Sequence, residues 1–188
     1  KGYARPDADE RKEVDVRRGI DDVLRLTSHR VHGIDVVCEY EDVEPVLAHP
    51  SKLQQVWTNL IVNAAEAIED EAADLKARAE ASPASGIYLP ARGHDEARIT
   101  IRAAMDGDQV EVQICDNGPG IAPEVLDRIM EPHFTTKAGR VRFGLGMGMS
   151  IVHSIIADLD GRLLIDSHPG STTMRILIPA HHVHEEES

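Results

Sequence analysis

Two asparagines lie four residues apart within the most regular helical pattern of the sequence. Apolar residues recur from Leu53 to Ile68 at the spacing of one helix face, and Asn59 and Asn63 fall together beside that face. Amide oxygens in such a row could contact a hydrated Mg²⁺ or water bound to phosphate. They could equally be structural hydrogen-bond partners inside the fold, and the spacing alone leaves both interpretations open.

A carboxylate stands at the end of an alternating strand pattern that finishes at Cys115. Residues 116–120, Asp-Asn-Gly-Pro-Gly, place Asp116 beside backbone that can approach a ligand closely because glycine has no side chain. A carboxylate there can accept a hydrogen bond from an exocyclic amine such as that of adenine. The same composition is also typical of a simple turn, so this segment by itself decides neither reading.

A glycine-rich segment precedes the last helical pattern. Gly144, Gly146 and Gly148 would expose backbone N–H groups at the positive end of a helix, which is a favourable place for an anion. Lys137 and two arginines shortly after it add positive charge, consistent with a segment that covers phosphates. The glycines do not follow the dinucleotide-binding fingerprint and the sequence contains no Walker A pattern. A nucleotide would therefore have to bind through another architecture.

The elements that must position these residues alternate between helices and pairs of strands. Hydrophobic periodicity predicts helices near residues 16–31, 53–68, 123–130 and 148–159, and strand pairs at 34–40 with 43–48, 98–105 with 109–115, and 163–166 with 173–178. Residues 70–97 are expected to form a charged helical extension and then a surface loop, as an insertion. Strand pairs separated by helices favour an α+β fold with a mixed, mainly antiparallel sheet covered on one face by helices.

Length and charge limit the class of protein. The 188 residues suit one domain with an insertion, and we expect an N-terminal linker over 1–13, the domain over 14–180 and a tail over 181–188. A net charge of -13 argues against a nucleic-acid partner, because neutralising phosphates needs clustered Lys and Arg. No apolar stretch approaches the roughly 18 residues of a membrane span, and the first residues lack the apolar core of a signal peptide. We therefore expect a cytoplasmic chain without a membrane segment.

Together the motifs resemble those of the catalytic and ATP-binding domain of two-component sensor histidine kinases, in the GHKL superfamily. Residues 59–67 are similar to the N box of that family, 116–120 to its G1 box, 131–137 to its F box, 144–150 to its G2 box and 169–179 to its last strand. All five occur in the family's order between about Val14 and Pro179. The resemblance implies the Bergerat fold, a two-layer α/β sandwich, with ATP and Mg²⁺ as cofactors.

The resemblance also implies a role for each matching residue. Asn63 would hold Mg²⁺ on the triphosphate, Asn59 would lie against phosphate or its water shell, and Lys137 would lie in the lid over ATP. These three form the implied catalytic set. Asp116 would accept a hydrogen bond from the adenine amino group, with Thr173 close to it beneath the base. Further nucleotide contacts are implied for Gly118, Gly120, Thr136, Gly144, Leu145, Gly146, Met147 and Gly148.

Two departures from the family's pattern bear on the reaction. Gyrase-like hydrolases have a Glu general base at the position of Asn59, so the asparagine favours phosphotransfer over autonomous ATP hydrolysis. None of the chain's histidines, including His29, His32 and His153, has the setting of the family's phosphoacceptor. The resemblance therefore implies a protein-histidine kinase domain that transfers the γ-phosphoryl group of ATP to a histidine outside this chain. The implied partners are that dimerisation and phosphoacceptor segment and the receiver domain of a response regulator.

Two other functions stay open on sequence grounds. One is a stand-alone Ser kinase of the anti-sigma type, although Phe134-Thr135-Thr136-Lys137 and the long G2 box favour the sensor-kinase reading. The other is a binding module in which ATP only orders the lid and creates a docking surface. Separating an enzyme from such a module requires a chemical experiment.

Overall fold

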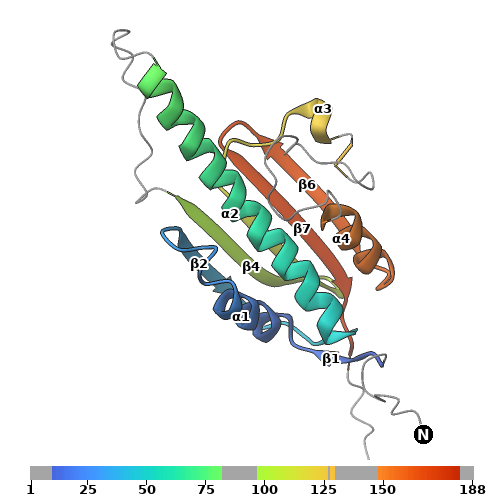
Figure 1. Ribbon diagram of the computed structural model, residues 1–188. Coiled ribbons are helices and arrows are strands. Elements are labelled where there is room, and N and C mark those ends of the chain that lie inside the picture. Colours follow the sequence, from blue (N-terminus) through green and yellow to red (C-terminus); the bar gives the residue numbers. More distant parts are fainter. Residues whose placement is uncertain (1–9, 82–96, 127, 130–147, 183–188) are drawn as a thin grey trace, which may run out of the picture.

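Figure 1 shows the computed structural model of the chain, which describes residues 10–81, 97–126, 128–129 and 148–182. Helices and strands alternate as the periodicity predicts. From the N-terminus the elements are β1 (Lys12–Val14), α1 (Val16–Leu26), β2 (Asp35–Tyr40), β3 (Val46–Ala48), α2 (Pro50–Ala81), β4 (Arg98–Asp106), β5 (Gln109–Asp116), α3 (Pro123–Leu126), α4 (Gly148–Ala157), β6 (Arg162–His168) and β7 (Ser171–Pro179).

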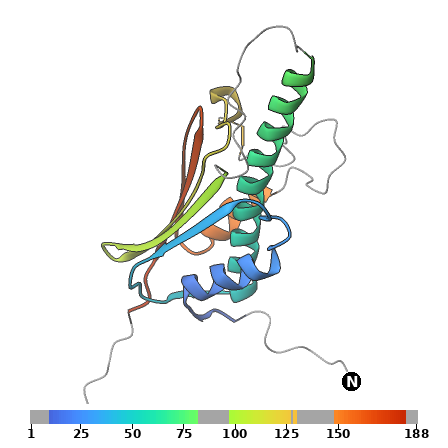
Figure 2. The ribbon, with the colours of Figure 1, turned by 90° about the vertical axis from the view of Figure 1, so that its left-hand side faces the viewer.

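A five-stranded sheet in the order β2-β4-β5-β7-β6 forms one layer of the molecule. Strand β2 runs parallel to β4, whereas the other three neighbouring pairs are antiparallel. Figure 2 shows the sheet on one side and helices α1 and α2 on the other. The predicted α+β fold, with a mixed and mainly antiparallel sheet under one layer of helices, is confirmed.

The predicted pairing of strands 34–40 and 43–48 is wrong. Strand β2 joins the edge of the large sheet, while β3 pairs with β1 in a separate two-stranded sheet. Val46 and Ala48 of β3 are fully buried, so the hydrophobic core anchors this short strand where it pairs with β1. Strand β1 begins at Lys12, inside the stretch that we expected to be a linker.

Helix α2 is the central element of the helical layer and lies between α1 and α4 (Figure 1). Its apolar stripe packs on the helix-facing residues of the sheet, and the resulting core is almost wholly aliphatic. The buried stripe consists of Leu53, Val56, Trp57, Leu60, Ile61, Ala64, Ala65 and Ile68. Because α2 is anchored along this stripe, residues on its other sides have fixed positions relative to the ends of the strands.

The same helix continues past its buried stripe to Ala81, and its far end extends beyond the strands in both ribbon views (Figures 1 and 2). Residues 69, 70 and 72–74 on this part are exposed. The predicted helical extension is therefore confirmed as a continuation of α2, and residues 82–96 of the predicted loop lie outside the described residues. Within the described part of the chain, no helix combines the length and apolar character needed to cross a membrane.

Candidate functional site

The asparagine row of α2 faces the first turn of α4. A β-carbon added at Gly148, the first residue of α4, would lie 3.7 Å from Asn59 Oδ1 and 3.9 Å from Asn63 Nδ2. Next to it, Met149 Sδ accepts a hydrogen bond from Asn63 Nδ2 at 3.6 Å. The fold thus brings together two features that the sequence separates widely, the asparagine pair and the end of the glycine-rich segment.

The side-chain nitrogen of Asn59 is buried and has no hydrogen-bond partner among the described residues. A buried N–H group without a partner is unfavourable by about 1–3 kcal/mol, and folded proteins rarely contain one. The described residues thus leave this donor of Asn59 unused, as they do Trp57 Nε1. A phosphate oxygen or an ordered water molecule would satisfy this nitrogen.

Asp116 ends β5 on the helix-facing side of the sheet, and only 6% of it is exposed. Its Oδ1 accepts a hydrogen bond from the backbone nitrogen of Gly118 at 2.9 Å. Burial raises the pKa of this carboxyl to about 6, the Gly118 hydrogen bond opposes that rise, and the negative charge of Glu71 on α2 adds to it. At neutral pH the group is still mostly ionised and is a strong hydrogen-bond acceptor.

The two glycines after Asp116 are needed for different structural reasons. A β-carbon at Gly118 would lie 2.8 Å from Asp116 Oδ1, so this glycine allows its backbone to meet the carboxylate. Gly120 has a φ of +81°, and a β-carbon there would come within 2.3 Å of the carbonyl oxygen of His168. Gly120 is thus required by its contact with the β6–β7 turn alone, and its predicted contact with a nucleotide stays a prediction.

The threonine beside Asp116 is Thr172, one residue before the predicted Thr173. Thr172 lies opposite Asp116 in the β5–β7 register, whereas Thr173 lies opposite Cys115. Successive side chains on a strand point to opposite faces, so Thr173 is on the side away from the helices. The sequence pattern could have predicted Thr172 instead of Thr173, because Thr172 alternates with Met174 and Ile176 and therefore lies on the same apolar face of the strand.

Ser167 on β6 supports this end of the site from the neighbouring strand. Its hydroxyl is 2.9 Å from Thr172 Oγ1 and accepts a hydrogen bond from the backbone nitrogen of Ile121 at 2.8 Å. These contacts hold the segment after Asp116 against the β6–β7 hairpin. Neither Ser167 nor Met149 was among the predicted site residues, and no local pattern identifies a contact such as Asn63 to Met149, which spans 86 positions.

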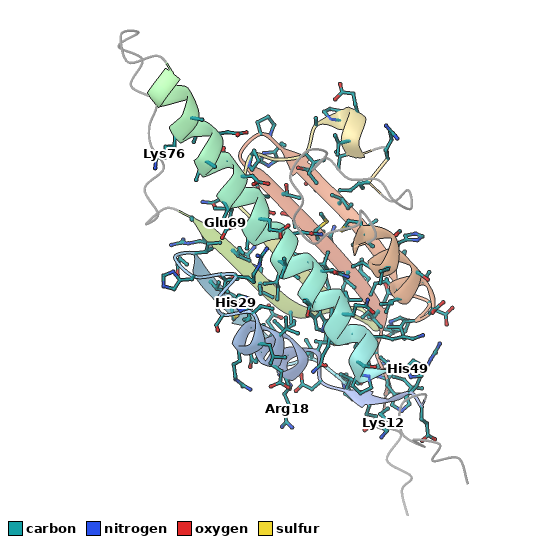
Figure 3. All side chains as sticks on the ribbon, in the orientation of Figure 1. Lys12, Arg18, His29, His49, Glu69 and Lys76 are labelled. Carbon is teal, nitrogen blue, oxygen red and sulfur yellow. The ribbon has the colours of Figure 1, made fainter. Side chains whose placement is uncertain are left out.

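The described part of the site joins α2, the end of β5, the start of β7 and the first turn of α4. Helix α4 packs against α2 and lies on the side of α2 opposite to the labelled His29 (Figure 3). No group of three or more His, Cys, Asp or Glu side chains in the described ranges could hold a metal ion. Among the described residues of the site, amide oxygens are the side-chain ligands that a cation could use. Six predicted site residues lie outside the described residues: Thr136, Lys137, Gly144, Leu145, Gly146 and Met147.

Comparison with known proteins gives one family match. The sequence model of that family, described as histidine kinase-, DNA gyrase B-, and HSP90-like ATPase, matches residues 48–182. The matched range contains every element that contributes to the site, from α2 to β7.

Two curated relatives and one solved structure extend this match. The chain is 34% identical over 160 residues to the sensor kinase CckA of Brucella abortus (strain 2308), covering 83% of this chain and 16% of CckA. It is 38% identical over 138 residues to the sensory histidine kinase/phosphatase NtrB of Rhizobium meliloti (strain 1021), covering 72% of this chain and 32% of NtrB. The chain thus spans less than half the length of either relative. Full-length ShkA in complex with AMPPNP shares the fold, with a TM-score of 0.69 at 23% identity over 92% of this chain and 32% of ShkA.

Proposed function

Because the chain belongs to the family of histidine kinase-, DNA gyrase B- and HSP90-like ATPases, we propose that it is the ATP-binding catalytic domain of a sensor histidine kinase. The predicted family is thereby confirmed. In this proposal the domain transfers the γ-phosphoryl group of ATP to a histidine on a phosphoacceptor segment outside this chain, and a receiver domain takes it next. The names of CckA and NtrB, both sensor kinases, support this activity. A cytoplasmic location stays a prediction.

The adenine end of ATP is proposed to lie at Asp116. The buried carboxylate keeps acceptor capacity beyond its bond to Gly118 and can accept a hydrogen bond from the amino group of adenine. Guanine presents a carbonyl oxygen at the same position, which would face the negative carboxylate without a proton between them. The site should therefore bind ATP in preference to GTP.

The phosphate end is proposed to lie over the asparagine row. The observation that carries this assignment is the approach of the side-chain-free Gly148 to Asn59 Oδ1 and Asn63 Nδ2. The buried nitrogen of Asn59, which has no partner among the described residues, supports it. When Mg²⁺ is bound, it would neutralise phosphate charge, and Asn63 Oδ1 would be its ligand from the described residues. Lys137 and the glycines at 144 and 146, which the structure does not describe, complete the proposed phosphate contacts.

The side chain at position 59 supports transfer over hydrolysis. A neutral amide cannot take a proton from water at neutral pH, so Asn59 cannot act as the general base of an autonomous ATPase. Phosphoryl transfer needs mainly positioning and charge stabilisation from the protein. The nucleophile in this proposal is an imidazole that another segment presents in line with the γ-phosphoryl group.

The proposal is tested by supplying the missing acceptor. The chain is incubated with labelled ATP and Mg²⁺, with a separately purified phosphoacceptor segment such as that of NtrB, and then with a receiver domain. We expect acid-labile, alkali-stable label on the segment, passage of label to the receiver, and no label on the chain alone. Asn63→Ala should abolish transfer. Tight ATP binding without label on any acceptor would identify a binding module and overturn the kinase assignment.

A further inference from the structure

The amide of Asn63 is in contact with a sulfur atom. Its Nδ2 donates a hydrogen bond to Met149 Sδ at 3.6 Å, and Met149 is 8% exposed. Met149 belongs to the hydrophobic core, where Val152 and Ile156 of the same helix are also buried. The sulfur is therefore held at a fixed position in the first turn of α4.

A thioether sulfur can accept a hydrogen bond but cannot donate one. Of the two ends of the Asn63 amide, only the nitrogen can bond to Met149, so the oxygen must point away from the sulfur. An apolar side chain at position 149 would impose no such preference, because both ends of an amide pack equally against a methyl group. The identity of this core residue thus sets the direction of a neighbouring polar group.

We infer that Met149 is a positioning residue that fixes the amide of Asn63 with its oxygen turned away from the sulfur and free to bind the Mg²⁺ of the nucleotide. The inference rests on the proposed function for the Mg²⁺ that this oxygen would bind. Without Met149, the amide would exchange between two orientations, and the orientation with Nδ2 toward Mg²⁺ would be unproductive. Part of the Mg²⁺-dependent affinity for ATP would then be lost.

Met149→Leu tests this role, because Leu keeps the volume of Met and removes the acceptor. Met174→Leu on β7 is the matched control, since Met174 is also 8% exposed in the same core. In the nucleotide-free protein, NMR should show hydrogen exchange of the Asn63 Nδ2 protons about threefold faster in Met149→Leu and unchanged in Met174→Leu. Equal exchange in wild type and Met149→Leu would overturn the inference, whether or not the chain binds ATP.

Calorimetry with ATP, in the presence and absence of Mg²⁺, tests the consequence for binding. We expect Met149→Leu to weaken ATP binding about threefold with Mg²⁺ and to leave binding without Mg²⁺ unchanged. In an Asn63→Ala background the same substitution should have no effect. Equal losses with and without Mg²⁺, or a loss that persists in the Asn63→Ala background, would assign Met149 a packing role only. Failure of the wild-type chain to bind ATP would instead overturn the proposed function.

Discussion

In the proposed function, Asp116 would make nucleotide binding depend on pH. Its pKa is raised to about 6, mainly by burial, so the carboxyl becomes protonated just below neutral pH. A protonated carboxyl presents its own hydrogen toward the adenine amino group and loses the acceptor that the site needs. If only the ionised form binds ATP, the affinity should be about tenfold weaker at pH 5 than at pH 7.

Calorimetry with ATP across this pH range checks the expectation. Asp116→Asn is the control, because it keeps the size of the side chain and removes the titration, while the phosphates of ATP titrate alike with both proteins. The variant should bind ATP weakly with a flatter pH profile than wild type. Parallel profiles for the two proteins would exclude Asp116 as the titrating group.

The same carboxyl makes the folded protein less stable as the pH rises. Its pKa is 3.8 when unperturbed and about 6 in the folded state, so between these values the folded state binds more protons than the unfolded state. The free energy of unfolding therefore falls as the pH rises through this range, by up to about 3 kcal/mol from this group.

Asp116→Asn should remove that loss and be more stable than wild type at pH 7, with a much smaller difference at pH 4. Urea unfolding at the two pH values, followed by the fluorescence of the fully buried Trp57, measures the difference. A stability gain that is equal at both values would mean that the carboxyl does not titrate in this range.

Gly148 keeps the space over the asparagine row open. Its added β-carbon would make only ordinary contacts with Asn59 and Asn63, so Gly148→Ala should fold normally. Its stability should change little, because Gly148 is the first residue of α4 and the helix propensity of Ala acts mainly in a helix interior. The methyl group would nevertheless occupy the space proposed for phosphate. We expect ATP binding to weaken about tenfold, which corresponds to about 1.4 kcal/mol.

Gly19→Ala is the matched control for this substitution. Gly19 lies in α1, and its added β-carbon would also make an ordinary contact, 3.5 Å from Trp57 Nε1. This variant should fold normally and keep full ATP affinity, as measured by calorimetry. Wild-type affinity in Gly148→Ala would show that phosphate does not lie against this residue.

At the scale of elements, the sequence predicted what hydrophobic periodicity controls. The stripe on α2 identified the central helix and placed Asn59 beside the core, and the alternation of β4 and β5 placed Asp116 at a strand end. Contacts between distant segments could not be predicted from the sequence. Three-residue strands such as β1 and β3 have too few side chains to show a period, and the sulfur of Met149 comes into contact with Asn63 only in the folded chain.

An ion pair holds the α1–β2 connection against the central helix. Arg30 bonds to Glu66 of α2, and 33% of the Arg30 side chain and 21% of the Glu66 side chain are exposed. Because both groups are partly shielded from water, Glu66→Gln should lower the free energy of unfolding by about 1 kcal/mol. Urea unfolding measures this, with Glu69→Gln on the exposed side of α2 as the control. Equal stability of the two variants would show that the pair contributes nothing.

At the scale of the whole molecule, the two faces of the sheet differ in chemistry. The face under the helices is apolar up to the level of Asp116 and Thr172, where the site begins. The other face carries ion pairs between neighbouring strands: Arg98 with Asp35, Arg102 with Glu39 and Arg175 with Glu111. These charged pairs suit a face in contact with water. A single layer of helices is therefore sufficient to cover the apolar face of the sheet. The site lies at the edge of this interface, which is the only extensive apolar interface in the described residues.

Because the site is built from α2, β5, β7 and α4, its ligand should stabilise the domain as a unit. A ligand that binds only the folded state, at 100 times its dissociation constant, raises the free energy of unfolding by about 2.7 kcal/mol. We expect this increase with ATP and Mg²⁺ in urea unfolding followed by Trp57 fluorescence, and a smaller one with GTP at the same concentration.

In Asn63→Ala, adding Mg²⁺ to ATP should give no further increase. Equal stabilisation by ATP and GTP would contradict recognition of adenine by Asp116, whereas a full Mg²⁺ effect in Asn63→Ala would place the cation on other residues.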